Sequence, residues 1–127
     1  MGIDESSFPG IFDIEVTFLE GPKSGDVENH QLWFLPGGRI LVLQPPFPGA
    51  GRWSITGDTL SFIVHNVILD DHGEPANIVR ITYPDGRLDP HGDAFEGKGT
   101  SKIYGPGALT ATQHFEQRGR RQSLPEK

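Results

Sequence analysis

The sequence contains no cysteine, which excludes a disulfide framework, a thiolate metal site and a cysteine nucleophile. It also has no apolar run that approaches the roughly 18 residues a membrane helix needs. The first ten residues, MGIDESSFPG, lack the basic segment and the apolar stretch of a secretory signal. We therefore expect a cytoplasmic protein with no membrane partner.

Basic residues are scarce. The chain has 11 Lys and Arg against 17 Asp and Glu, a formal net charge of −6, whereas binding to phosphates needs a basic face. We expect no nucleic-acid partner. The one basic cluster is Arg118, Arg120 and Arg121. Contact with an anionic partner is one interpretation of this cluster, and a solvated tail after the last strand is the simpler one.

The length and the turn-forming residues favour one compact β domain. A chain of 127 residues fits one domain with a real core, and 17 Gly with 11 Pro indicate many turns. We predict a single domain over residues 1–127, with a barrel over about 9–118 and a flexible basic tail over 119–127.

Apolar and polar residues alternate along most of the chain, and no window of eleven or more keeps a helical period. Phe12, Ile14, Val16 and Phe18, for example, alternate with acids and Thr17. PPFPGAG, residues 45–51, is expected to be a loop because proline cannot join the interior of a strand ladder. The predicted strands are 11–20, 30–35, 39–44, 52–55, 59–69, 77–83, 94–104 and 109–117.

Short turns join these segments, so strands adjacent in sequence are expected to pair. Closing such a meander removes its two unpaired edges. We predict an all-β fold: a single eight-stranded antiparallel up-and-down barrel whose interior is filled by side chains or holds one small ligand. An open β-sandwich is the alternative.

Four segments, FPGIFDIEVTF, LWFLPGGRILVL, GRWSITGDTLSF and GDAFEGKGTSKIYGPGAL, resemble the strand–turn–strand pattern of lipocalin-like (calycin) barrels, especially compact single-domain actinobacterial forms. The lipocalin G-x-W appears here as Gly10, Ile11 and Phe12, with a different aromatic residue. The resemblance implies a barrel that binds a hydrophobic small molecule. Similar barrels include cofactor-free polyketide cyclases that form spiroketals or catalyse Diels–Alder reactions.

Alternation assigns the side chains that face the lumen. Gly97 and Gly99 share this face, either to bend their strand or to leave room for a neighbour. Segment 77–83 is ambiguous, with either Tyr83 or Arg80 inside. The other predicted inward residues that bear on a site are Phe34, Gln44, Trp53, Phe62, Asn66, Phe95, Ser101, Leu109, Gln113 and Phe115.

Several amides on one cavity wall need an explanation, because an unpartnered buried amide costs roughly 1 to 3 kcal/mol. They either bond one another or a buried water, or they converge on a ligand's oxygens. Asp13 and Glu15 would enter the lumen only if their strand slipped by one residue. In that register Glu15 could serve as a general acid. His30, Trp33 and Tyr104 are candidates for the rim.

Two functions follow. The first is a cofactor-independent cyclase or isomerase that folds a polyketide-like or terpenoid substrate in the lumen. The second is a carrier for a hydrophobic small molecule. A stably packed barrel that acts through a protein-binding surface is a third reading, and a homodimer is compatible with it. No two of the five histidines are spaced i, i+2, so no metal site is predicted.

The candidate residues divide by role, with Phe47 expected on a lid formed by 45–51. The catalytic candidates are Asn66, Gln113, Tyr83, Arg80 and Glu15. The ligand-binding candidates are Trp53, Gln44, Phe34, Phe62, Phe95, Ser101, Phe47 and Trp33.

Overall fold

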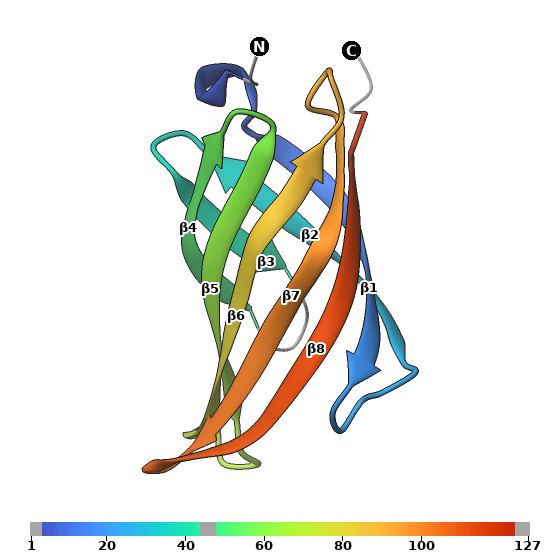
Figure 1. The fold of residues 1–127 in the computed structure, drawn as a ribbon. Helices are drawn as coiled ribbons and strands as arrows, with labels where there is room; N and C mark the ends of the chain where they lie inside the picture. Colours follow the sequence, from blue (N-terminus) through green and yellow to red (C-terminus); the bar gives the residue numbers. More distant parts are fainter. Residues whose placement is uncertain (1–3, 44–47, 124–127) are drawn as a thin grey trace.

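The structure, a computed structural model, describes residues 4–43 and 48–123. It is a closed barrel of eight antiparallel strands in chain order, preceded by one short 3-10 turn (Figure 1). This confirms the predicted fold class. The elements are η1 (Glu5–Ser7), β1 (Gly10–Glu20), β2 (Val27–Leu35), β3 (Arg39–Leu43), β4 (Gly49–Thr56), β5 (Thr59–Leu69), β6 (Pro75–Leu88), β7 (Ala94–Gly105) and β8 (Ala108–Arg121).

The barrel has two distinct ends. The first and last described segments and the β2–β3, β4–β5 and β6–β7 turns lie at one, the upper end in Figure 1, and the β1–β2, β5–β6 and β7–β8 turns lie at the lower end. Gly37 and Gly38, in the β2–β3 turn, have φ values of +82° and +78°. Only glycine adopts such angles without strain. The Gly-Gly pair therefore makes this tight hairpin.

Several strands are longer than predicted. β2 begins at Val27 rather than at residue 30, and β4 begins at Gly49, inside the segment predicted as a loop. The rest of that loop lies largely outside the described residues. β8 continues to Arg121 and pairs with β1 through Phe12, so the prediction that the barrel ends near 118 and a tail begins at 119 is wrong. The composition of this segment is polar and suggested a solvated tail, but hydrogen-bonded pairing with β1 and β7 holds it in the sheet.

The ambiguous strand has one clear orientation. Tyr83 is fully buried, Val79 and Ile81 share its inward face, and Arg80 is exposed. The strand continues through Pro84, Asp85 and Gly86, and the β6–β7 register shifts between Thr82 and Arg87. The segment 84–86 is therefore a bulge within β6 and does not end the strand.

Alternation predicts most of the core correctly. Phe12, Ile14, Val16 and Phe18 of β1 are all at most 8% exposed, so the strand keeps its expected register. Leu109 is an exception, because it was expected inside and is 51% exposed. The β7–β8 register shifts between Ile103 and Tyr104 and pairs Leu109 with Tyr104. That one-residue bulge turns Leu109 to the outer face.

Aromatic rings close the upper half of the lumen. Phe8, which follows η1, stacks on Phe12 with 5.1 Å between ring centroids and meets the edge of Phe34 at 4.9 Å. The Ile55 amide donates a 2.8 Å hydrogen bond to Glu5 Oε2, which ties η1 to β4. We call this cluster the aromatic plug; its members are Phe8, Phe12, Phe34, Trp53, Phe62, Tyr83 and Phe95.

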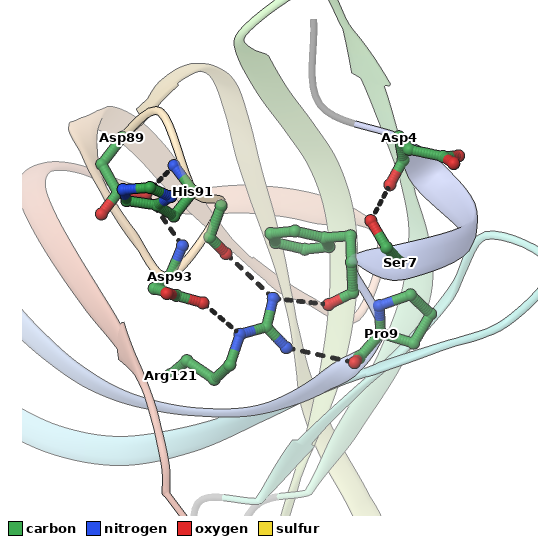
Figure 2. A network of polar contacts seen from close by, with 9 residues as sticks. Asp4, Ser7, Pro9, Asp89, His91, Asp93 and Arg121 are labelled. Carbon is green, nitrogen blue, oxygen red and sulfur yellow. Dashed lines mark hydrogen bonds and ion pairs between the residues drawn. The ribbon is translucent and has the colours of Figure 1, made fainter.

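Arg121 fastens the plug from outside (Figure 2). Its guanidinium donates to the carbonyls of Phe8 (3.0 Å), Pro9 (3.2 Å) and Gly92 (2.9 Å) and to Asp93 Oδ1 (2.8 Å). It also lies 4.7 Å from the centroid of the Phe12 ring, a cation–π contact. One side chain from the last strand thus joins the first strand, the plug and the β6–β7 turn.

Nothing in residues 4–43 and 48–123 forms a helix with the length and apolar character needed to cross a bilayer.

Candidate binding cavity

A cavity occupies the lower half of the lumen, below the aromatic plug. Its volume is about 240 Å³, room for about eight water molecules at roughly 30 Å³ each. Drug-sized ligands take sites of about 300 to 1,000 Å³, so this cavity fits a smaller molecule. The surface that its lining presents is mostly apolar, and the lining residues are Val16, Phe18, Lys23, Glu28, His30, Asn66, Ile68, Val79, Ile81, Ser101, Ile103, Gln113, Phe115 and Gln117.

Four neutral polar side chains interrupt this apolar wall. Asn66, Ser101, Gln113 and Gln117 are each at most 4% exposed. Ser101 Oγ donates to Gln113 Oε1 across the β7–β8 ladder at 3.5 Å. Gln113 Nε2 and Gln117 Nε2 are buried and have no hydrogen-bond partner among the described residues. Two amide donors are therefore left for a molecule in the cavity.

His30 brings an imidazole to the same wall. It lies on the inward face of β2, and its buried Nδ1 has no hydrogen-bond partner in the described part of the chain. Burial lowers the pKa of His30, because it disfavours the charged ring, while the Glu28 carboxylate acts in the opposite direction. Since its ordinary pKa is about 6.5, the ring is mainly neutral at neutral pH.

An ion pair marks the mouth. Lys23, in the β1–β2 turn, pairs with Glu28 of β2, and their side chains are 46% and 24% exposed. The Lys23 ammonium also lies 5.6 Å from the centroid of the Phe18 ring. Among residues 4–43 and 48–123, these are the only two ionised side chains in the lining, and they belong to a single hairpin at the edge. Charge is thus confined to the entrance.

Tyr83, a predicted catalytic residue, belongs to the plug and does not line the cavity. Its hydroxyl donates to the backbone carbonyl of Gln117 at 3.2 Å. Burial raises the pKa of Tyr83 well above its usual value, and the negative charge of Glu96 adds to the effect. The phenol therefore stays protonated and supports the strand that carries Gln117.

The glycines of β7 make room for rings of the barrel itself. A Cβ on Gly99 would lie 2.5 Å from Cζ of Phe115, and one on Gly97 would lie 3.0 Å from the Tyr83 hydroxyl. Both distances are too short for a side chain to fit without movement. Of the two explanations for these glycines, the structure supports close approach, and the neighbours are two aromatic side chains and the backbone carbonyl oxygens of Thr82 and Asp85 on β6.

Other predicted site residues lie elsewhere. Trp53, Phe34, Phe62 and Phe95 form part of the plug, and Trp53 Nε1 donates to the carbonyl of Leu35 at 3.0 Å. These four side chains are core in this structure, since none lines the cavity. They pack against one another in place of a ligand.

Three candidates point away from the lumen. Arg80 is exposed on the outer face of β6, where its Nε donates to His65 Nε2 at 3.2 Å, so the alternative with Arg80 inside is wrong. Glu15 is also outside, paired with Arg118 at 3.0 Å, and the alternative register with Glu15 inside is wrong too. Trp33 is on the outer face with its Nε1 3.3 Å from Gln31 Oε1. Gln44 and the lid residue Phe47 lie outside the described residues.

Of the predicted site residues that are described, Asn66, Ser101 and Gln113 line the cavity together. Gln117 was missed, although alternation from Gln113 and Phe115 along the same strand already indicates it. Lys23 and Glu28 were missed because nothing local distinguishes a hairpin at a mouth from any other charged turn. His30 was placed at a rim, and the structure places it in the cavity wall.

The described residues include no group of three or more His, Asp or Glu side chains that could hold a metal ion. Comparison with known proteins gives no further guide: no protein-family model, no curated protein and no solved structure matches the chain. The barrel is the architecture that the lipocalin resemblance implies.

Proposed function

We propose that this barrel binds a small, mostly apolar molecule that carries a hydrogen-bond-accepting oxygen, such as a ketone. The proposal rests on the unpartnered Nε2 groups of Gln113 and Gln117 in a cavity of about 240 Å³. An amide donor without a partner costs roughly 1 to 3 kcal/mol of stability. A ligand oxygen that accepts from one of these donors removes that cost, while the apolar wall binds the rest of the molecule.

A matched pair of probes tests the polar part of this recognition. α-Tetralone and tetralin have nearly the same shape and differ by the carbonyl oxygen. We expect both to enter the cavity and the ketone to bind about tenfold more tightly, the factor that corresponds to one hydrogen bond of about 1.4 kcal/mol. NMR titration should shift the side-chain amide resonances of Gln113 or Gln117 with the ketone.

Two variants complete this test. Gln113→Leu and Gln117→Leu together should abolish the preference for the ketone and keep tetralin binding. Gln31→Leu, on the outer face of β2, is the matched control and should change neither affinity. If neither probe binds, or if the preference survives in the double variant, the proposal fails.

His30 supports a second candidate, an isomerase or cyclase of ketone-like substrates. A neutral imidazole can take a proton from the carbon next to a carbonyl, and amide donors can stabilise the negative charge that develops on the oxygen. The proton would move from that carbon to a ring nitrogen of His30 and return to the same or a conjugated carbon. No cofactor is required for this step.

Deuterium exchange separates the two candidates. An enzyme should speed the exchange of the hydrogens next to the carbonyl of α-tetralone in deuterated water, and His30→Gln should abolish that acceleration while the ketone still binds. Binding with no acceleration by the unmodified protein would exclude proton transfer through His30 and favour the carrier. A cyclase of polyketide-like or terpenoid substrates that acts through His30 requires a positive result here first.

A further inference from the structure

An apolar surface crosses the outside of the barrel at its lower end. Val67, Ile78, Tyr104 and Leu109 are direct cross-strand partners in succession, from β5 through β6 and β7 to β8. Leu69 extends this row along β5. We call the five residues the outer patch. Four of them are exposed: Val67 by 38%, Leu69 by 47%, Ile78 by 46% and Leu109 by 51%.

The outer patch has opposite charges on its two sides. On one side the next cross-strand row is His65, Arg80 and Lys102. On the other side the β5–β6 turn carries Asp71 and Glu74, both exposed. No ion pair within the described residues includes Arg80, Lys102, Asp71 or Glu74. The charges here are segregated: Arg80 contacts the His65 ring nitrogen and the Tyr104 ring, and no carboxylate of the described residues pairs with it.

Nearer the upper end, the outer face of the same strands β6, β7 and β8, together with β1, is arranged differently. There Arg87, Glu96, Arg118 and Glu15 are cross-strand partners in succession, with alternating sign. Arg87 pairs with Glu96 at 3.3 Å, and Arg118 with Glu15 at 3.0 Å. That surface satisfies its charges alone and is suited to water. The outer patch, in contrast, leaves both its apolar groups and its flanking charges available.

We infer that the outer patch is the contact surface of a homodimer with two-fold symmetry. Such an interface uses the same surface on both subunits. A two-fold axis that passes through the outer face of β6 near Asn77 relates position 80 of one copy to position 74 of the other. It therefore places the basic row of each copy over the acidic turn of its partner, and the two apolar rows over each other. The patch is complementary to itself in charge and in polarity.

Sedimentation equilibrium over a range of protein concentrations tests this inference. We expect the unmodified chain to dimerise, and Ile78→Glu to weaken the dimer by at least about thirtyfold, as a charge at the centre of an interface should. Ile63→Glu is the matched control: Ile63 is 48% exposed on the same sheet face of β5, beyond the basic row. A chain that is monomeric at all concentrations overturns the inference, and so does a dimer equally sensitive to both variants.

Charge reversal tests the symmetry itself. Arg80→Glu with Lys102→Glu gives a copy whose two flanks are acidic, and Asp71→Lys with Glu74→Lys gives a copy whose two flanks are basic. Each double variant alone should be mainly monomeric. An equimolar mixture should form a one-to-one heterodimer, because each acidic flank of one variant then faces a basic flank of the other. Failure of the mixture to associate, when both variants keep the circular dichroism of the unmodified protein, overturns the inferred arrangement.

Discussion

Removal of the Arg121 side chain should cost more stability than removal of any other charged group of the barrel wall. The Arg121 side chain is only 25% exposed, so its hydrogen bonds to the carbonyls of Phe8 and Gly92, at 3.0 and 2.9 Å, are weakly screened. Hydrogen bonds from a charged group contribute about 1.5 to 3 kcal/mol each. The ion pair with Asp93 adds less, because the Asp93 side chain is 58% exposed.

These contributions are not additive, and the loss of one partner from a partly buried network typically costs about 3 to 5 kcal/mol. We take about 3 kcal/mol as the expected loss for Arg121→Ala, since part of the network reaches solvent. Arg121→Lys should lose less free energy of unfolding than Arg121→Ala but should remain less stable than the unmodified protein. An ammonium keeps the charge, but it lacks the planar fork that joins three carbonyls. The control is Arg118→Ala. The side chains of Arg118 and Glu15 are 68% and 45% exposed, so their ion pair contributes about 0 to 1 kcal/mol.

Equilibrium unfolding in urea measures the free energy of unfolding of all three variants. Equal slopes against urea concentration would show that the variants unfold from similarly compact states. If Arg121→Ala and Arg118→Ala lose the same free energy within about 1 kcal/mol, Arg121 does not fasten the plug. The upper end would then be closed without a contribution from Arg121.

Three further predictions concern the lumen. Phe8→Ala should lower the free energy of unfolding by about 3 to 5 kcal/mol, because the ring is buried in the plug; a loss under about 1 kcal/mol would show that the plug is dispensable. Gly99→Ala should cost about 1 to 3 kcal/mol through displacement of the Phe115 ring, and a neutral effect in urea unfolding would contradict that crowding. Since the pKa of His30 is lowered in the folded state, the unfolded chain binds the proton more readily, and stability should fall as the pH drops below about 6.5. His30→Gln should make this pH dependence shallower, and an unchanged slope would refute the assignment.

The sequence predicts the barrel well, because the strands alternate with a period of two and closure follows from short turns between them. It predicts Asn66, Ser101 and Gln113 as inward residues for the same reason. It does not predict how the lumen divides. Whether Phe34, Phe62 and Phe95 contact a ligand or one another depends on where Phe8 lies, and Phe8 comes from a segment before the first strand.

Bulges are a second feature that the sequence does not predict. A register shift of one residue reverses the face of everything beyond it, and the shift beside Tyr104 places Leu109 outside. Strand ends are a third, because the basic run that ends at Arg121 looks like a tail until its pairing with β1 is known. The division of the lumen and the strand end fail for the same reason, because the deciding contact is distant in sequence. The bulge lies instead in a tight hairpin, where Tyr104 and Leu109 are close in sequence and alternation alone does not show the extra residue.

A cavity shaped for a ligand should lower the free energy of unfolding of the ligand-free protein. That lowered stability distinguishes the proposed binding site from a core whose polar groups only stabilise the fold. If Gln113 Nε2 and Gln117 Nε2 have no partner in the empty protein, an apolar side chain of similar size relieves a cost of roughly 1 to 3 kcal/mol for each. Gln117→Leu should therefore raise the free energy of unfolding by about 1 kcal/mol, with the remainder lost to imperfect packing, while it weakens ketone binding. Stability gained at the expense of binding is typical of functional sites. Urea unfolding without ligand decides the question: if Gln117→Leu destabilises the empty protein, the amide is held by bonds that stabilise the fold, and the main support for a ligand in the lumen is lost.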